Sequence, residues 1–357
     1  MFEAPRGWTP GGTDQVNTLN DDDNLTGTGT NPTLNFTYVD NSDVVGAASL
    51  VTPTLTGIET INVDVVGTTA GKALDLQDST GVKAVNVSRI NANTTNYNTQ
   101  NVTEALSSMS VNNSQAPGAN VAFTFLASAL AGSSDAADVT LNNANIATLR
   151  IEENNAAPTQ GYETLTLSSV GSANSVTSLQ AEDLQTLNIA GSQNLTVGGF
   201  ANVAGSLTTI NGADATGNLD LNLNGNVLNA IPDGASSGNI ALSVTTGTGD
   251  DTVRVTADTI GATDRIDLGE GNDTVRLQSA VTNNFTPAVT GEANVFGVEN
   301  LSVVRTADAV IPIVPAASTL TVDMARFDGD QAITLSNLGD SASGAAATKF
   351  AAAGADG

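Results

Sequence analysis

A seven-residue pattern that recurs along the chain decides the fold. It reads GIETINV at residues 57–63, GYETLTL at 161–167 and GVENLSV at 297–303. Looser copies with the same layout are GVKAVNV at 81–87, NIATLRI at 145–151 and DLQTLNI at 183–189. Each copy ends in an apolar, a polar and an apolar residue, which is the period of a strand with one buried face.

Short triplets of the same kind fill the intervals, for example LTV at 195–197, LSV at 242–244 and IDL at 266–268. A strand this short cannot bury a face alone, but strands stacked about 4.8 Å apart share one continuous apolar column. Related strands recur at intervals of roughly 20–24 residues, with Gly and Asn at the corners. We therefore expect an all-β chain, a parallel β-solenoid or β-roll-like stack with small helical insertions.

A set of tandem β-sandwiches is the alternative, because sandwiches also combine short strands with glycine-rich turns. Sandwiches usually fill a thick core with aromatic side chains, and only 4% of this chain is aromatic. The composition therefore favours the solenoid.

The charge balance excludes several classes of protein. The 357 residues include 11 Lys plus Arg against 37 Asp plus Glu, a formal net charge of -26, and no His or Cys. An electrostatic nucleic-acid binder needs a basic face, so nucleic acid is not an expected partner. Zinc, copper and haem sites built on His or Cys are excluded, as are His-dependent triads. No apolar stretch is long enough for a transmembrane segment, and the N-terminus does not resemble a Sec signal peptide.

Two matched turns carry the most specific chemical signal. GTGDDTVRV at 247–255 and GEGNDTVRL at 269–277 agree in their glycines and in the Asp-Thr-Val-Arg run that follows. Glycine lets the backbone bend tightly, and aspartate adds hard oxygen ligands of the kind that calcium prefers. The alternative is a solenoid corner with a capped turn and no ion.

This pair resembles the nonapeptide of the RTX (repeats-in-toxin) calcium-binding β-rolls, although Thr246 and Leu268 stand where that family has its leading glycine. In that family, ions lie between adjacent coils. The resemblance implies bound Ca²⁺, with two facing turns completing one oxygen shell. Carried over to this sequence, the candidate metal-binding residues are Gly247, Gly249, Asp250, Asp251, Gly269, Gly271, Asn272 and Asp273.

A second acidic cluster lies near the N-terminus, in NDDDNLTGTG at 20–29. Consecutive carboxylates repel one another unless a cation or solvent relieves them. The cluster looks like the entry to an RTX-type module, so Asp21 and Asp23 are further candidate calcium ligands. A solvated loop is the alternative.

Domain organisation follows from these features. We expect an acidic module rich in Gly and Asn at 1–45, and an irregular solenoid at 46–245 with a short helical insertion near 121–132. RTX-like coils with further strands follow at 246–340, and a flexible tail or truncated element at 341–357.

Catalysis is not expected. Asp250 and Asp251 are adjacent on a turn and cannot face each other across a sugar as an acid/base pair. Arg254 and Arg276 occupy matching strand positions, and we expect them to form an outward ladder paired with acidic neighbours such as Asp267.

The resemblance extends to the large calcium-dependent proteins that bacteria export by type I secretion, which include surface-layer (S-layer) proteins, adhesins and RTX toxins. It implies a secreted, extracellular structural protein of the bacterial cell surface that self-assembles into a calcium-stabilised lattice. Copies of the chain itself are the expected partner, with cell-surface polysaccharide as a second. A type I-secreted adhesin or ligand-binding module is the alternative, and a polysaccharide-active β-helix enzyme is the third reading.

Overall fold

The computed structural model describes residues 1–8, 15–39, 49–67, 71–201, 203, 206–224, 241–256, 264–279, 295–305, 319–323, 327–328, 332–336 and 349–353. The chain divides into two compact units, Met1–Val203 and Ala204–Gly357. Each unit consists of short parallel strands that stack coil upon coil, so the expectation of an all-β parallel solenoid is confirmed. No helix in the described ranges is long and apolar enough to span a membrane.

The first unit holds strands β1 to β18. Their bounds are β1 Phe2–Ala4, β2 Gly7–Trp8, β3 Gln15–Val16, β4 Asn24–Thr26, β5 Thr33–Tyr38, β6 Ser49–Val51, β7 Thr54–Thr56, β8 Thr60–Val65, β9 Lys72–Asp75, β10 Ala84–Ser88, β11 Asn96–Val102, β12 Ser108–Phe125, β13 Ala136–Glu153, β14 Thr164–Val170, β15 Asn174–Gln180, β16 Thr186–Gly191, β17 Leu195–Val197 and β18 Phe200–Ala201.

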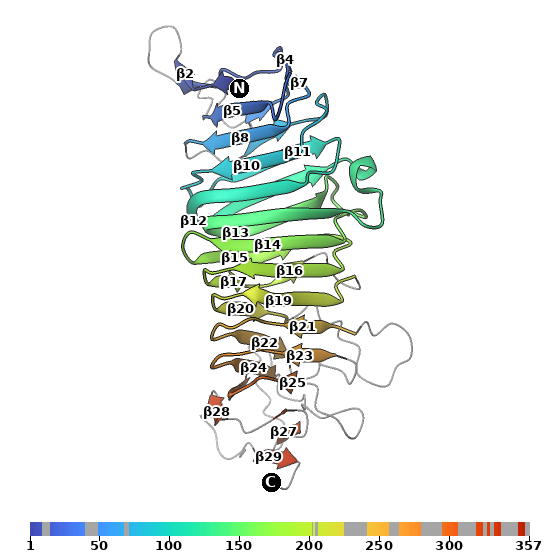
Figure 1. Cartoon of the computed structure of the whole chain (residues 1–357). Helices are drawn as coiled ribbons and strands as arrows, with labels where there is room; N and C mark the ends of the chain where they lie inside the picture. Colours follow the sequence, from blue (N-terminus) through green and yellow to red (C-terminus); the bar gives the residue numbers. More distant parts are fainter. Residues whose placement is uncertain are drawn as a thin grey trace. The chain divides into compact units, whose positions relative to one another are not determined.

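Two ribbons of parallel strands run through this unit (Figure 1). One follows β1, β5, β8, β10, β12, β13, β14 and β16. The other follows β6, β9, β11, β12, β13, β15 and β17. Strands β12 and β13, with 18 residues each, take part in both ribbons. Among the strand pairs described in this unit, β2 and β3 are antiparallel.

The register of the first ribbon gathers its apolar side chains into buried columns. One column is Leu34, Ile61, Val85, Met109, Val139, Leu167 and Ile189, each at most 2% exposed. Full burial of such a side chain contributes about 1.5–3 kcal/mol. The apolar positions predicted from the heptapeptide copies therefore form the core.

The outward positions of the same strands carry a ladder of amides. Asn62 Nδ2 donates to Asn35 Oδ1 at 2.7 Å, and Asn86 Nδ2 donates to Asn62 Oδ1 at 2.8 Å. The ladder begins at Glu3, which accepts from Asn35, and continues to the Ser110 hydroxyl, which donates to Asn86 Oδ1. Identical amides can bond in this way only when coils repeat in register.

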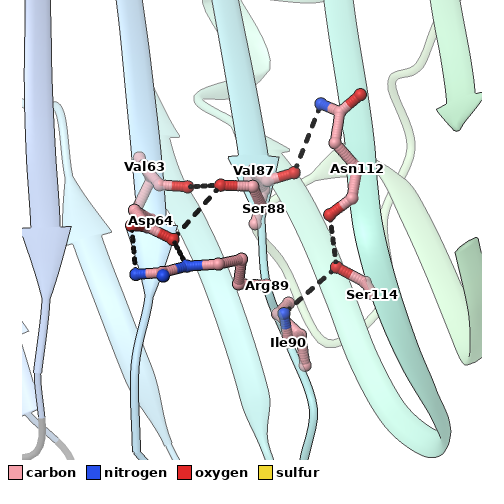
Figure 2. Close-up of polar contacts among 8 residues, drawn as sticks. All are labelled: Val63, Asp64, Val87, Ser88, Arg89, Ile90, Asn112 and Ser114. Atoms are coloured by element: carbon pink, nitrogen blue, oxygen red, sulfur yellow. Dashed lines mark hydrogen bonds and ion pairs between the residues drawn. The ribbon is translucent and has the colours of Figure 1, made fainter. Parts of the chain in front are cut away.

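Side chains close the corner that follows β10, beside the end of β8 and the bend within β12 (Figure 2). Arg89 has a left-handed backbone, with φ of 62°, and its guanidinium forms a bidentate ion pair with Asp64 one coil earlier. Ser114 Oγ accepts from Ile90 N at 3.1 Å and so satisfies a buried backbone donor of the preceding coil. The left-handed position recurs at Asn113, Asn143 and Gly171, residues that tolerate it best.

The expected helix near 121–132 is much shorter than the sequence indicated. Residues up to Phe125 belong to β12, and the helical part is the single 3-10 turn η1, Ala127–Leu130. Val121, Phe123 and Phe125 are fully buried, because their alternation places all three on the core side of the strand. The apolar alternation and aromatic content of this run outweigh its later alanines.

The second unit holds strands β19 to β29. Their bounds are β19 Thr209–Ala215, β20 Leu219–Asn222, β21 Ser243–Thr245, β22 Thr252–Thr256, β23 Arg265–Asp267, β24 Thr274–Ser279, β25 Val295–Phe296, β26 Asn300–Arg305, β27 Thr319–Asp323, β28 Ala332–Ser336 and β29 Lys349–Ala353. Strands β20, β22, β24, β26 and β28 form one parallel ribbon, and β19, β21, β23 and β25 form another. In the predicted tail 341–357, the described residues form β29, which pairs with β27.

Tyr162 joins coils that are not neighbours. Its hydroxyl accepts from Leu106 N at 2.8 Å and donates to Leu106 O at 2.9 Å, and its ring packs edge-on against Phe125. Leu106 precedes β12 and Tyr162 precedes β14, so the side chain passes over the coil of β13.

We expect Tyr162→Phe to lower the free energy of unfolding by about 1–3 kcal/mol, because a buried N–H and a buried carbonyl lose their partner together. Urea unfolding followed by circular dichroism measures the loss. Tyr97→Phe is the matched control, since the buried Tyr97 hydroxyl bonds to the rotatable Thr99 hydroxyl at 3.1 Å and not to a backbone group in the described part of the chain. Equal losses in the two variants would contradict a special role for the Leu106 contact.

Candidate functional site

The two glycine turns predicted to hold calcium belong to a stack of four turns in the second unit. The turns lie at 215–218, 246–251, 268–273 and 296–299, directly before β20, β22, β24 and β26. Backbone bonds tie successive turns together: Thr248 N donates to Ala215 O at 3.2 Å, and Glu270 N donates to Gly247 O at 3.1 Å. The structure therefore brings all eight candidate residues of this pair into one stack.

Close stacking explains why these turns contain glycine. A Cβ atom on Gly269 would meet the Gly247 carbonyl oxygen, and one on Gly271 would meet the Gly249 carbonyl oxygen. A Cβ atom on Gly247 would likewise meet the Ala215 carbonyl oxygen, one coil earlier. A side chain at any of these positions would push the coils apart, so the Gly-x-Gly signature has a packing cause independent of any ion.

Carboxylates run through the stack as a column in which each accepts a backbone N–H from the preceding coil. Two of these acids, Asp251 and Asp273, are buried, and the third, Glu299, is exposed. Asp251 Oδ1 accepts from Leu219 N, Asp273 Oδ1 from Asp251 N, and Glu299 Oε2 from Asp273 N, all at 2.7 Å. Asp251 Oδ2 also accepts from Gly247 N at 3.2 Å. We call Asp251, Asp273 and Glu299 the carboxylate column.

A second column lies beside it and bonds in the opposite direction. Asp250 N donates to Asn218 Oδ1, and Asn272 N donates to Asp250 Oδ1, both at 3.0 Å, so here the acceptor lies in the earlier coil. Asn300 Nδ2 continues the series by donating to Asn272 Oδ1 at 2.9 Å. Adjacent backbone amides at 250 and 251 thus bond to coils on opposite sides.

Of the three acids in the carboxylate column, Asp273 is the one whose charge is least compensated. Its side chain is fully buried, and its Oδ2 atom has no hydrogen-bond partner. Burial raises the pKa of Asp273 from 3.8 to about 7, against the opposing effect of the backbone hydrogen bond from Asp251. Burial also raises the pKa of Asp251. An uncompensated negative charge at this depth is unfavourable, and either a proton or a cation would relieve it.

Three observations bear on the fit of these residues to calcium. The unpartnered, buried Asp273 Oδ2 is the kind of oxygen that a cation could use. Against this, three of the four carboxylate oxygens of Asp251 and Asp273 accept backbone N–H groups. No group of three acidic side chains within the described residues converges as a metal cage. Calcium needs about six to eight oxygens, so its binding at these turns stays a prediction.

The N-terminal candidates lie in the first unit and also bond to the next coil. Asp21 Oδ1 accepts from Thr52 N at 2.7 Å, and Asp23 Oδ2 accepts from Asn20 N at 2.9 Å. Thr54 N donates to Asp23 O at 2.9 Å. This cluster is therefore an exposed turn that is hydrogen-bonded to β7 and to the residues just before it. Calcium binding there also stays a prediction.

Sequence analysis did not identify every residue that contributes to the stack. Glu299 ends the carboxylate column. Asn218 and Asn300 belong to the second column, which lies beside it. The sequence did contain a signal for Glu299. Aligning NLSV at 300–303 with TVRL at 274–277 places Glu299 at the same position of its coil as Asp273. The register of β24 and β26 pairs Thr274 with Asn300 and confirms this alignment.

The expected pairing of the two arginines with Asp267 is wrong. Arg254 forms its ion pair with Asp220, while Asp267 pairs with Arg265. Asp267 lies on β23, which belongs to the other ribbon, so it is not on the face that carries Arg254 and Arg276.

The fold and the turns define a parallel β-solenoid with internally hydrogen-bonded coil corners. Among curated proteins, the chain is similar to an S-layer protein of Synechocystis sp. (strain ATCC 27184 / PCC 6803 / Kazusa), with 30% identity over 226 residues. The match covers 56% of this chain but 12% of that relative's length, so the similarity concerns a small part of a much larger protein. No protein-family model and no solved structure matches the chain.

The raised pKa of Asp273 predicts that protons stabilise the stacked turns. Its pKa is higher in the folded than in the unfolded chain, so the folded state binds more protons between about pH 4 and pH 7. The contribution of Asp273 to stability is therefore full near pH 4, falls as the pH rises to about 7, and is constant above. The upper limit of the change is roughly 4 kcal/mol.

Hydrogen exchange in peptides from 247–277, measured with a calcium chelator and corrected for the intrinsic pH dependence of exchange, should show loss of protection over that range. Asp273→Asn keeps an oxygen acceptor for Asp251 N but cannot titrate. If this variant shows the same pH profile as the natural chain, Asp273 is not the responsible group.

Proposed function

We propose that this chain is a structural, non-enzymatic part of a bacterial cell-surface protein that assembles with copies of itself into a surface layer. The similarity to the Synechocystis S-layer protein carries the proposal. The solenoid supports it, because coils stacked in register give each unit long, regular outer faces suited to repeated contacts. Secretion by a type I system and contact with cell-surface polysaccharide belong to the same proposal.

The chemistry of the turns supports a structural role. In the carboxylate column, the two buried acids, Asp251 and Asp273, accept hydrogen bonds from backbone donors of the neighbouring coils. Buried donors must be satisfied if the coils are to remain stacked. Asp250 and Asp251 bond to opposite neighbouring coils, an arrangement suited to cohesion of the stack.

Electron microscopy of the purified chain with millimolar calcium tests the assembly. We expect ordered sheets or arrays, whereas isolated particles under all conditions would contradict a surface layer and favour an adhesin. Release of sugars from surface polysaccharide by the purified chain would contradict the non-enzymatic assignment.

We also propose that Ca²⁺ binds at the stacked turns and promotes assembly. The support is the unpartnered Asp273 Oδ2, the raised pKa of that carboxyl, and the net charge of -26. A divalent cation would neutralise the carboxylate column and reduce repulsion between copies. The ligands that we propose are oxygens of Asp250, Asp251, Asn272 and Asp273, together with those of Gly247, Gly249, Gly269 and Gly271.

For the calcium site, we expect the natural chain to bind Ca²⁺ with a dissociation constant of about 10⁻⁴–10⁻³ M, as extracellular sites do. The paired change Asp251→Asn and Asp273→Asn removes two charges but keeps the oxygen acceptors, and should lower the number of bound ions in calorimetry and native mass spectrometry. The matched control is Asp78→Asn with Asp138→Asn, which removes two charges from exposed residues.

Light scattering separates a specific site from simple screening. Calcium should drive assembly at concentrations where magnesium, or sodium chloride at matched ionic strength, does not. An unchanged ion count in the Asp251/Asp273 variant, or equal assembly with magnesium or sodium, would contradict the proposed site.

A further inference from the structure

Arg276 has an unusual position among the basic residues of this acidic protein. Five basic residues each form an ion pair with a carboxylate: Lys83, Arg89, Arg150, Arg254 and Arg265. Among the side chains that the structure describes, Arg276 is the basic group with neither an ion pair nor a hydrogen bond, and its Nε atom is buried without a partner.

The register of the strands explains why Arg276 is unpaired. Arg254 and Arg276 are direct neighbours on β22 and β24, and Asp220 and Thr252 are direct neighbours on β20 and β22. Arg254 reaches one coil back and two residues toward the N-terminus to pair with Asp220. The same step from Arg276 leads to Thr252, so the solenoid repeats the arginine but not its carboxylate.

An unpaired guanidinium at this place is costly. Neighbouring parallel strands are about 4.8 Å apart, so Arg276 lies beside the like charge of Arg254. The side chain of Arg276 is only partly exposed. Its Nε atom is shielded from water and has no hydrogen-bond acceptor in the protein. The terminal nitrogens of Arg276 are not among the buried atoms, so a carboxylate arriving from outside would accept their hydrogen bonds and relieve the repulsion. Guanidinium binds carboxylate in a planar, two-bond geometry.

We propose that Arg276, supported by Arg254, binds a carboxylate side chain of a second copy of this chain. The inference rests on the proposed self-assembly and identifies one contact that holds copies together. Charge supports this choice of partner: with 37 acidic against 11 basic residues, every copy carries carboxylates in excess over basic groups. In an assembly of such chains, an unpaired arginine attracts the surface of another copy.

The test uses the full chain and compares the concentration at which assembly begins, measured by light scattering and sedimentation in calcium. We expect Arg276→Gln to raise this concentration roughly tenfold, the effect of losing one charge-assisted contact. Arg265→Gln, which removes an equal charge but one already paired with Asp267, should change it by less than about twofold. Thermal unfolding of both variants confirms that they fold.

Thr252→Asp gives an independent variant that keeps Arg276. It places a carboxylate where Asp220 stands relative to Arg254, so Arg276 becomes paired within its own chain and assembly should weaken about as much as in Arg276→Gln. Thr252→Asn, similar in shape but uncharged, should assemble like the natural chain.

The outcomes are separable. If the natural chain assembles and Arg276→Gln assembles at the same concentration, the contact is overturned while the proposed function stands. If the natural chain never assembles, the proposed function fails and this contact fails with it. If Arg276→Gln assembles normally but is no longer retained on immobilised polygalacturonate, a carboxylated polysaccharide that retains the natural chain, the contact between copies is overturned in favour of an acidic glycan.

Discussion

The stacking of one coil on the next in register is the constraint on which the rest of the structure depends. Parallel strands about 4.8 Å apart place like residues above one another, so apolar positions merge into buried columns and amides into ladders. The same spacing excludes side chains at Gly247, Gly269 and Gly271, where the carbonyl of the coil before lies against the turn. Core, outer face and corner chemistry thus follow from a single geometric repeat.

That repeat also decides how an acidic chain uses its charges. Within the stack, carboxylates serve as acceptors for backbone donors, as Asp251 and Asp273 do in the second unit. Glu163 plays the same part in the first unit by accepting from Asp135 N at 2.7 Å. On the outside, carboxylates pair with five of the described basic residues, and the register of the strands leaves Arg276 without such a partner.

Much of the fold could be predicted, because alternation and repeat spacing are visible in the sequence. The heptapeptide copies identified strands and core, and the matched turns at 247–255 and 269–277 were correctly placed one coil apart. The helix near 121–132 was mostly wrong, since strand alternation and alanine content compete in one short run. The pairing of Arg254 with Asp220 and the unpaired state of Arg276 could not be read from the sequence, because they depend on the ribbon and the register position that each residue occupies. Whether the turns hold an ion depends on carbonyl and carboxylate directions, which spacing alone does not determine.

The bond between Tyr162 and Leu106 has a consequence for how this chain could change in length. A solenoid in which each coil contacts only its neighbours can gain or lose whole coils by duplication or deletion with little harm. Tyr162 reaches across the coil of β13, so removing that coil or adding another beside it would separate the hydroxyl from the backbone of Leu106. Relatives that differ by entire coils are therefore expected to keep the interval between these two residues and to vary outside it.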